Sequence, residues 1–117
     1  MYFSITPDVG KVRYLASKIV SMEEIKLKLD DKGEGSFYVL DGGEEIAQLV
    51  VSVSGNEMIA HHTEVFPKGE GKGLGKRLVN ELADYARKNN LKIVARCPFV
   101  HGQFKRYPEK YGDIWAG

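Results

Sequence analysis

The residues best suited to chemistry form a glycine-rich run at positions 70–75, which reads Glu-Gly-Lys-Gly-Leu-Gly. A strand-like segment, 59–66, precedes the run, and an amphipathic segment, 74–89, follows it. Glycines let backbone N–H groups approach an anion closely, and a helix start offers unpaired donors and the positive end of the helix dipole. The spacing therefore predicts a phosphate-binding turn between a strand and a helix.

Two common phosphate-binding loops do not fit this run. A P-loop needs Gly-Lys followed by Ser or Thr, but Arg77 follows Lys76, and Glu70 stands where the first glycine belongs. A dinucleotide-binding fingerprint has the spacing Gly-x-Gly-x-x-Gly, whereas the glycines here alternate with single residues. A different class of phosphate-bearing ligand is therefore expected.

The elements that must position this turn are readable from periodicity. Alternating apolar residues predict four strands in succession, at residues 24–30, 36–40, 46–54 and 58–66. Their connections are too short for crossovers, so these strands form an antiparallel meander. Helix 74–89 then leads to a fifth strand, 91–95, which must lie parallel to the fourth. Residues 99–115 are expected to form short helical turns broken by Pro108 and Gly112.

The run resembles the acyl-CoA pyrophosphate loop of the GNAT superfamily of N-acyltransferases, whose pattern is Gln or Arg, two residues, Gly, one residue, then Gly or Ala. Glu70, Gly73 and Gly75 occupy those positions. His-Thr-Glu-Val at 62–65 and Cys-Pro-Phe-Val at 97–100 extend the resemblance to a compact GNAT subfamily. The resemblance implies an α/β (α+β) fold: a mixed, mostly antiparallel sheet with a splayed parallel pair, strands four and five, and a crossover helix.

The resemblance covers about residues 22–115, so we expect a GNAT-like domain over 22–117 and an N-terminal extension over 1–21. Residues 1–6 of this extension are expected to form a short strand. Thr6 as N-cap, Pro7 at the first helical position and apolar residues at helical spacing predict an amphipathic helix over 7–21. The extension either supplies the first strand and helix of a larger GNAT layout or is a dispensable arm.

By resemblance, the ligand is acetyl-CoA or coenzyme A, whose pantetheine arm enters the gap between strands four and five. The backbone of Val65 and Phe66 would bind that arm as an added strand does. The N–H groups from Gly71 to Lys76 would bind the pyrophosphate. The expected cofactor-binding residues are Val65, Phe66, Gly71, Lys72, Gly73, Leu74, Gly75 and Lys76. Glu70 departs from the family pattern, and its carboxylate is unfavourable near a pyrophosphate unless it points away.

Acetyl transfer to an amine has two possible routes here. In the direct route, His62 or Glu64, on one face of strand four by alternation, removes a proton from the amine. In the covalent route, Cys97 takes the acetyl group first, with His62 or His101 stabilising its thiolate. The structural alternatives are a buried Cys97, a His62 with a satisfied side chain and a solvated Glu64. Tyr107 is a further candidate proton donor to the CoA sulfur.

Composition narrows the classes of ligand and of cellular location that remain possible. The net charge of +1 gives no reason to expect nucleic acid. The one cysteine excludes an internal disulfide and favours a reducing cytoplasm. No apolar run is long enough for a membrane span, and no His, Cys and Asp spacing suggests a metal site. We expect an enzyme acting on an amine of a small molecule or protein, as a monomer or weak homodimer. The alternative is an acyl-CoA-binding module of the same fold with little or no turnover.

Overall fold

The computed structural model describes residues 23–116, so the extension expected at 1–21 lies outside the described part of the chain. The described residues form one five-stranded sheet with the strand order β1-β2-β3-β4-β5. The strands are β1 (Glu23–Leu29), β2 (Glu34–Asp41), β3 (Glu44–Ser54), β4 (Glu57–Val65) and β5 (Lys92–Ala95). The helices are the 3-10 turn η2 (Pro67–Gly69), α1 (Leu74–Lys88), α2 (Pro98–Arg106) and α3 (Pro108–Tyr111).

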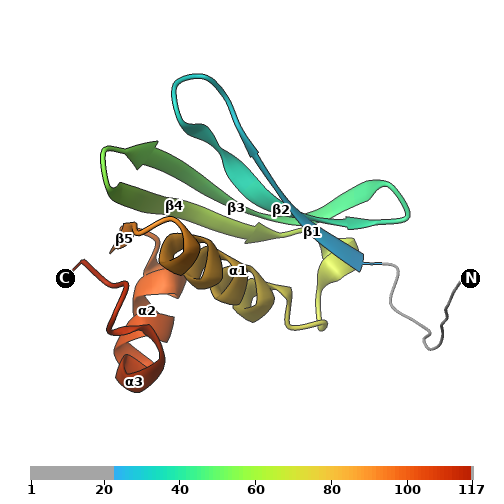
Figure 1. Cartoon of the computed structure of the whole chain (residues 1–117). Helices are drawn as coiled ribbons and strands as arrows, with labels where there is room; N and C mark the ends of the chain where they lie inside the picture. Colours follow the sequence, from blue (N-terminus) through green and yellow to red (C-terminus); the bar gives the residue numbers. More distant parts are fainter. Residues whose placement is uncertain (1–22, 117) are drawn as a thin grey trace, which may run out of the picture.

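The sheet has the predicted mixed topology. Short turns join β1 to β4 into an antiparallel meander, and β5 pairs with β4 in parallel after the crossover through α1. The fold class expected from the sequence is therefore confirmed. Helices α1, α2 and α3 all lie on the same side of the sheet (Figure 1). Among residues 23–116, no helix is long and apolar enough to cross a membrane.

Strands β4 and β5 pair over only part of β4. The parallel ladder joins Glu57–Ala60 to Lys92–Ala95, and β4 then continues to Val65 without β5 beside it. On the β5 side, Cys97 begins helix α2 with Pro98 in its first turn, and proline cannot extend a strand ladder. The two strands therefore part after Ala60, as the family resemblance implied.

A β-bulge on β4 marks the point of divergence. Val50 of β3 pairs with His62, and the next β3 residue, Val51, pairs with Ala60, so His61 is a surplus residue. A bulge bends its strand and increases the local twist. The bend therefore turns the second half of β4 away from the direction that β5 follows.

The core lies between the sheet and the helices. The apolar face predicted for α1 is confirmed, because Leu74, Leu78, Leu82 and Ala86 are all fully buried against the sheet. Replacing one such leucine with alanine typically costs about 2–5 kcal/mol. The aromatic tail completes the core: the ring of Phe104 lies 4.9 Å from that of Tyr111, centroid to centroid. The start of α1 thus follows the end of β4 after η2 and the glycine run, on the helix-covered side of the sheet.

The end of α1 differs slightly from expectation. Leu91, predicted as the first residue of the fifth strand, instead closes the helix by donating its N–H to the carbonyl of Ala86 (2.8 Å). The preceding residue, Asn90, has a φ of 56°, a left-handed conformation that asparagine tolerates better than most residues. The strand therefore begins one residue later, at Lys92.

Candidate functional site

The N-terminus of α1 has no protein cap. Gly73 is the N-cap residue, with a φ of 68° that favours glycine, and it has no side chain to accept a hydrogen bond. The first turn carries no acidic residue. The first N–H bonded within the helix is that of Arg77, to the carbonyl of Gly73. The N–H groups of Leu74, Gly75 and Lys76 thus lie at the positive end of the dipole, where anions bind.

A cleft of about 380 Å³ opens at this helix start, a volume within the range of small-molecule sites. It is lined by Val65, Gly69, Glu70, Gly71, Gly73, Leu74, Gly75, Lys76 and Phe99. Six of the eight expected cofactor-binding residues are in this lining, and Phe66 and Lys72 are not. The cleft lies where β4, the glycine run and the start of α2 meet.

The ring of Phe99 explains the glycine at position 75. A Cβ atom on Gly75 would lie 3.0 Å from two carbons of this ring, closer than ordinary van der Waals contact. Phe99 is itself 39% exposed, which is unusual for so large an apolar side chain. The ring thus forms one wall of the cleft, against the first turn of α1.

The lysines of the glycine run differ in their surroundings. Lys76 lines the cleft, but Lys72 leans toward the β2–β3 hairpin, with Nζ 3.8 Å from Oδ2 of Asp41. The neighbouring Lys68 donates to Oε1 of Glu44 (2.7 Å), and this hydrogen bond raises the pKa of Lys68 above its ordinary value. Lys76 is therefore better placed than Lys72 to meet an anion in the cleft.

The backbone edge of β4 that faces the gap is formed by Thr63 and Val65, whereas Val65 and Phe66 were expected there. Phe66 donates its N–H to the carbonyl of Ile46 (2.9 Å), and its carbonyl accepts the N–H of Gly69 (2.8 Å). In an antiparallel pair, successive residues turn their backbone groups to opposite sides. Val65 and Thr63 therefore direct theirs away from β3, toward the gap. The backbone of Phe66 is thus committed to β3 and η2, whereas that of Val65 faces the gap; binding of a pantetheine arm at this edge stays a prediction.

Thr63 and Cys97 meet near the point where the strands part. The Thr63 hydroxyl and the Cys97 thiol lie 3.1 Å apart. Cys97 is only 3% exposed, and its N–H donates to the carbonyl of Ala60 (2.9 Å). Sequence reasoning missed Thr63, although strand alternation placed it on the face opposite His62 and Glu64. The thiol is thus buried, next to a polar hydroxyl on the helix side of the sheet.

His62 and Glu64 lie on the other side of the sheet. Nε2 of His62 is 3.8 Å from Oε1 of Glu64, and the two side chains are 63% and 48% exposed. The shared face expected from alternation is therefore present. Because Thr63 and Cys97 lie on the helix side, the structure does not bring His62 to the thiol.

His101 is not directed at the thiol either. Its ring packs edge-to-face on Trp115, with 5.5 Å between centroids, and only its backbone N–H contacts Cys97, at the carbonyl oxygen. Within residues 23–116, the side-chain partner of the Cys97 thiol is Thr63. The two predicted groups of catalytic residues thus occupy opposite faces of the gap.

The bulge residue His61 makes a contact that the sequence did not suggest. Its Nε2 lies 2.8 Å from Oγ of Ser52 on β3. The hydrogen bond anchors the surplus residue to its neighbouring strand, on the same face as His62. In the part of the chain that the structure describes, no three metal-ligating side chains come together.

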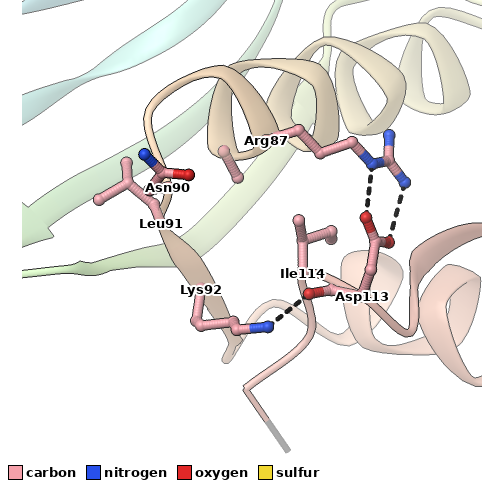
Figure 2. A pocket seen from close by; sticks show the side chains of 7 residues that line it. Arg87, Asn90, Leu91, Lys92, Asp113 and Ile114 are labelled. Carbon is pink, nitrogen blue, oxygen red and sulfur yellow. Dashed lines mark hydrogen bonds and ion pairs between the residues drawn. The ribbon is translucent and has the colours of Figure 1, made fainter.

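A larger hollow, of about 470 Å³, lies at the opposite end of α1 (Figure 2). There Arg87 donates to both carboxylate oxygens of Asp113, at 2.8 and 3.1 Å. These hydrogen bonds hold the pKa of Asp113 below, and that of Arg87 above, the ordinary value. Lys92 donates to the backbone carbonyl of Asp113. Because these groups satisfy one another, the hollow is a structural junction that fastens the tail.

Comparison with known proteins agrees with this geometry. Residues 36–114 match the model of the GCN5-related N-acetyl-transferase family. A GCN5-like protein from Staphylococcus aureus, solved by NMR, is 31% identical over 79% of this chain and 88% of that chain, with a TM-score of 0.58. A ribosomal-protein-alanine N-acetyltransferase from Brucella melitensis biovar Abortus 2308 has the same fold, at 21% identity and a TM-score of 0.54 over 74% of this chain and 64% of that chain.

Curated proteins gave no significant match. The family match, however, spans most of the described sheet and all of α1 and α2, including the uncapped helix start and the divergent strands. The chain therefore belongs to the GCN5-related N-acetyltransferase (GNAT) family.

Proposed function

We propose that this protein transfers the acetyl group of acetyl-CoA to an amine of a small molecule or a protein, as a member of the compact GNAT subfamily with a Cys-Pro-Phe-Val element. One observation carries the proposal: an uncapped helix N-terminus opens onto a cleft at the mouth of a parted strand pair. This arrangement suits a ligand with a phosphate group at one end and a long arm at the other.

The chain's own groups provide both halves of such a site. The N–H groups of Leu74, Gly75 and Lys76 would bind the pyrophosphate, with the Lys76 ammonium beside them. The backbone edge at Thr63 and Val65 would bind the pantetheine arm as an added strand does. Acetyl-CoA itself supplies an acetyl group that is already activated as a thioester.

In the direct route, the amine approaches from the open face of the sheet. His62 and Glu64 are exposed there and 3.8 Å apart, so either one can accept the amine proton directly or through water. The route assigns the two faces of the gap to the two substrates. The cofactor arrives from the helix side, and the amine from the side of the histidine and glutamate.

In the covalent route, the Cys97 thiol gives up its proton and Sγ forms a thioester with the acetyl group; the thioester bond of acetyl-CoA breaks, and the leaving CoA thiolate takes up that proton. The amine then attacks the acetyl-cysteine, its C–S bond breaks, and the proton lost by the amine returns to Sγ to regenerate the thiol. The geometry supports the direct route over this one, because the Cys97 side chain is buried and its thiol lies 3.1 Å from the Thr63 hydroxyl, whereas His62 lies on the other side of the sheet.

The test begins with thermal unfolding in the presence of CoA and acetyl-CoA, because a ligand that binds only the folded state raises the melting temperature. We expect a rise with both. Release of free CoA is then recorded with a panel of small amines and peptides. No change in melting temperature at millimolar ligand would contradict the proposal.

Cys97→Ala and Glu64→Gln separate the two routes. We expect Cys97→Ala to retain CoA binding and most of the transfer rate, and Glu64→Gln or His62→Gln to lower the rate with CoA binding unchanged. An acetyl adduct in intact-mass spectra of the wild type that Cys97→Ala abolishes would establish the covalent route instead.

The second candidate is an acyl-CoA-binding module with little turnover. The observation that favours it is the separation of the buried thiol from the exposed histidine and glutamate. CoA binding without CoA release for every amine tested would support it. The acceptor amine, a cytoplasmic location and a monomeric or weakly dimeric state remain predictions from the sequence.

A further inference from the structure

The gap between β4 and β5 closes at a defined place. Pairing of the two strands ends at Ala60, whose carbonyl accepts the N–H groups of Arg96 (3.1 Å) and Cys97 (2.9 Å). Beyond the bulge residue His61, the next β4 side chain on the helix side of the sheet belongs to Thr63. Thr63 and Cys97 therefore face each other across the closed end of the gap.

The Thr63 hydroxyl can bind more than its present partner. A hydroxyl has one donor and two acceptor positions, and a thiol is a weak donor. Oγ1 of Thr63 lies 3.1 Å from Sγ of Cys97, so when the thiol donates to Oγ1, the O–H of Thr63 stays available to a third group. Cys97 is buried and Thr63 is half-buried, so the hydroxyl is the more accessible of the two groups.

The proposed function brings the reactive end of acetyl-CoA to this hydroxyl. The pyrophosphate would lie at the first turn of α1, and the pantetheine arm would follow the backbone edge of Val65 and Thr63. An arm that enters beside the glycine run and follows this edge toward Ala60 ends where the gap closes. The thioester would therefore lie beside the Thr63 side chain.

We propose that Thr63 is a catalytic residue whose hydroxyl donates a hydrogen bond to the sulfur of the leaving CoA, an assignment that rests on the proposed function. The amine nitrogen forms a bond to the acetyl carbon, and the amine proton passes to His62 or Glu64. The C–S bond breaks, and its electron pair goes to the CoA sulfur, where the Thr63 O–H stabilises the negative charge. The base then gives its proton to water, and the CoA thiolate takes one up from water.

Cys97 acts through Thr63 in this step. Its S–H donates to Oγ1, so the hydrogen of the Thr63 hydroxyl is directed elsewhere, to the sulfur of the cofactor. The hydrogen bond of its N–H to the carbonyl of Ala60 holds Cys97 in place. Cys97 is therefore a positioning residue, a role that requires neither an acetyl adduct nor a contact with histidine.

Tyr107, the other candidate partner of the CoA sulfur, is less well placed. Cys97 and Tyr107 are the N-cap and C-cap residues of α2, at opposite ends of the helix. At 1.5 Å per residue, their backbones lie about 15 Å apart along its axis. The Thr63 hydroxyl, by contrast, is within hydrogen-bonding distance of Cys97 at the closed end of the gap.

The first test separates kcat from cofactor binding. Thr63→Val keeps the size and branching of the side chain and removes the hydroxyl. We expect it to lower kcat about tenfold, less than the loss of a donor to an oxyanion, because sulfur is a weak acceptor. The dissociation constant for acetyl-CoA, measured by calorimetry, should stay at the wild-type value. Thr63→Ser keeps the hydroxyl and should recover most of kcat. Equal kcat in the wild type and Thr63→Val would overturn the assignment.

The second test needs no acceptor amine. A hydroxyl that binds the CoA thiolate better than the thiol lowers the pKa of the bound CoA thiol. Cys97→Ser removes the one cysteine of the chain and keeps a donor there, so the ultraviolet absorbance of a thiolate reports CoA alone. We expect this pKa to be about one unit lower in Cys97→Ser than in the double variant Cys97→Ser, Thr63→Val, the equivalent of a tenfold preference for the thiolate.

The pair of variants controls for the other titrating groups near the gap. His62 and Glu64 lie on the opposite face of the sheet and are the same in both variants. Melting temperatures show whether the variants fold, and Thr63→Ala takes the place of Thr63→Val if the valine variant does not. The same pKa of bound CoA with and without the hydroxyl would overturn this inference while the proposed function stands. An absence of CoA binding to the wild type would overturn both.

Discussion

The two ends of helix α1 differ in whether their unpaired backbone groups find partners within the protein. At the C-terminal end, the side-chain amide of Asn89 donates to the carbonyl of Tyr85 (2.8 Å), and Leu91 donates to that of Ala86. Basic residues occupy the last turn, and Arg87 is fixed by Asp113 (Figure 2). At the N-terminal end there is no side-chain cap, and the first turn carries no acid.

This difference distinguishes a helix end that stabilises the fold from a helix end that is suited to bind a ligand. Helix ends leave unpaired backbone groups that need partners. The C-terminal end finds such partners within the protein, and the charged groups of its hollow, Arg87, Lys92 and Asp113, bind one another. The N-terminal end leaves three N–H groups facing a cleft. A hollow of larger volume is thus structural, and a smaller one is the candidate binding site.

The largest expected effect comes from placing a negative charge at the uncapped end. Gly73→Glu should weaken CoA binding by about a hundredfold, because its carboxylate competes for the N–H groups that the pyrophosphate needs. Calorimetry measures the loss. Gly55→Glu is the control, since Gly55 has a similar φ, 60° against 68°, and open space around its Cα. Similar CoA affinity in both variants would mean that the loop does not bind the pyrophosphate.

A change at the other end should affect stability alone. Asp113→Asn removes the charge that Arg87 binds at 2.8 Å, and both side chains are partly exposed, so solvent screens the pair. We expect the free energy of unfolding to fall by about 0.5 kcal/mol and the melting temperature by about 2–4 °C. CoA affinity should stay at the wild-type value. A loss of affinity would show that the tail contributes to the binding site.

The effect of Asp113→Asn on stability should depend on pH in a defined way. The hydrogen bond to Arg87 holds the folded-state pKa of Asp113 below the ordinary value of 3.8. A carboxyl group with a lowered pKa stabilises the fold above its unfolded pKa, and this contribution is lost as pH falls through the folded value. The stability difference between wild type and Asp113→Asn should therefore be constant from neutral pH downward and decline below 3.8. Denaturant titrations across this range measure it.

The smallest effect concerns Glu70, the acid that lines the cleft where the family pattern has Gln or Arg. Glu70→Gln should tighten CoA binding by about two- to threefold at low salt, because an exposed like charge is worth only about 0.5 kcal/mol. The gain should shrink at about 1 M salt, where charges are screened. Glu57→Gln, at the far end of β4, should change nothing. Weaker binding in Glu70→Gln would mean that the carboxylate helps to hold the loop.

Local patterns in the sequence were enough to predict the topology, and they singled out the glycine run at which the structure has a cleft. The strand, glycine run and helix at 59–89 required a crossover, and this set β5 parallel to β4. The leucines at 74, 78 and 82 identified the buried face of α1. Alternation on β4 put His62 and Glu64 on one face. Each of these inferences depends on neighbouring residues, whose spacing a sequence states directly.

The features that sequence reasoning missed depend on distant residues. Whether Val65 or Phe66 faces the gap is fixed by the hydrogen bond of Phe66 to Ile46, and thus by register. The contact of Thr63 with Cys97 joins residues 34 positions apart, and that of Arg87 with Asp113 joins residues 26 apart. Glycine at 75 lets the ring of Phe99, 24 positions later, form one wall of the cleft.

The surplus residue of β4, His61, has a consequence for how the gap between β4 and β5 arose. On the β4 side, the divergence from β5 depends on chain length rather than on a particular side chain, because His61 bends the strand by being one residue too many. Deleting this single codon would straighten the strand without exchanging its faces. The second half of β4 could then lie closer to β5, and the gap between the two strands would narrow.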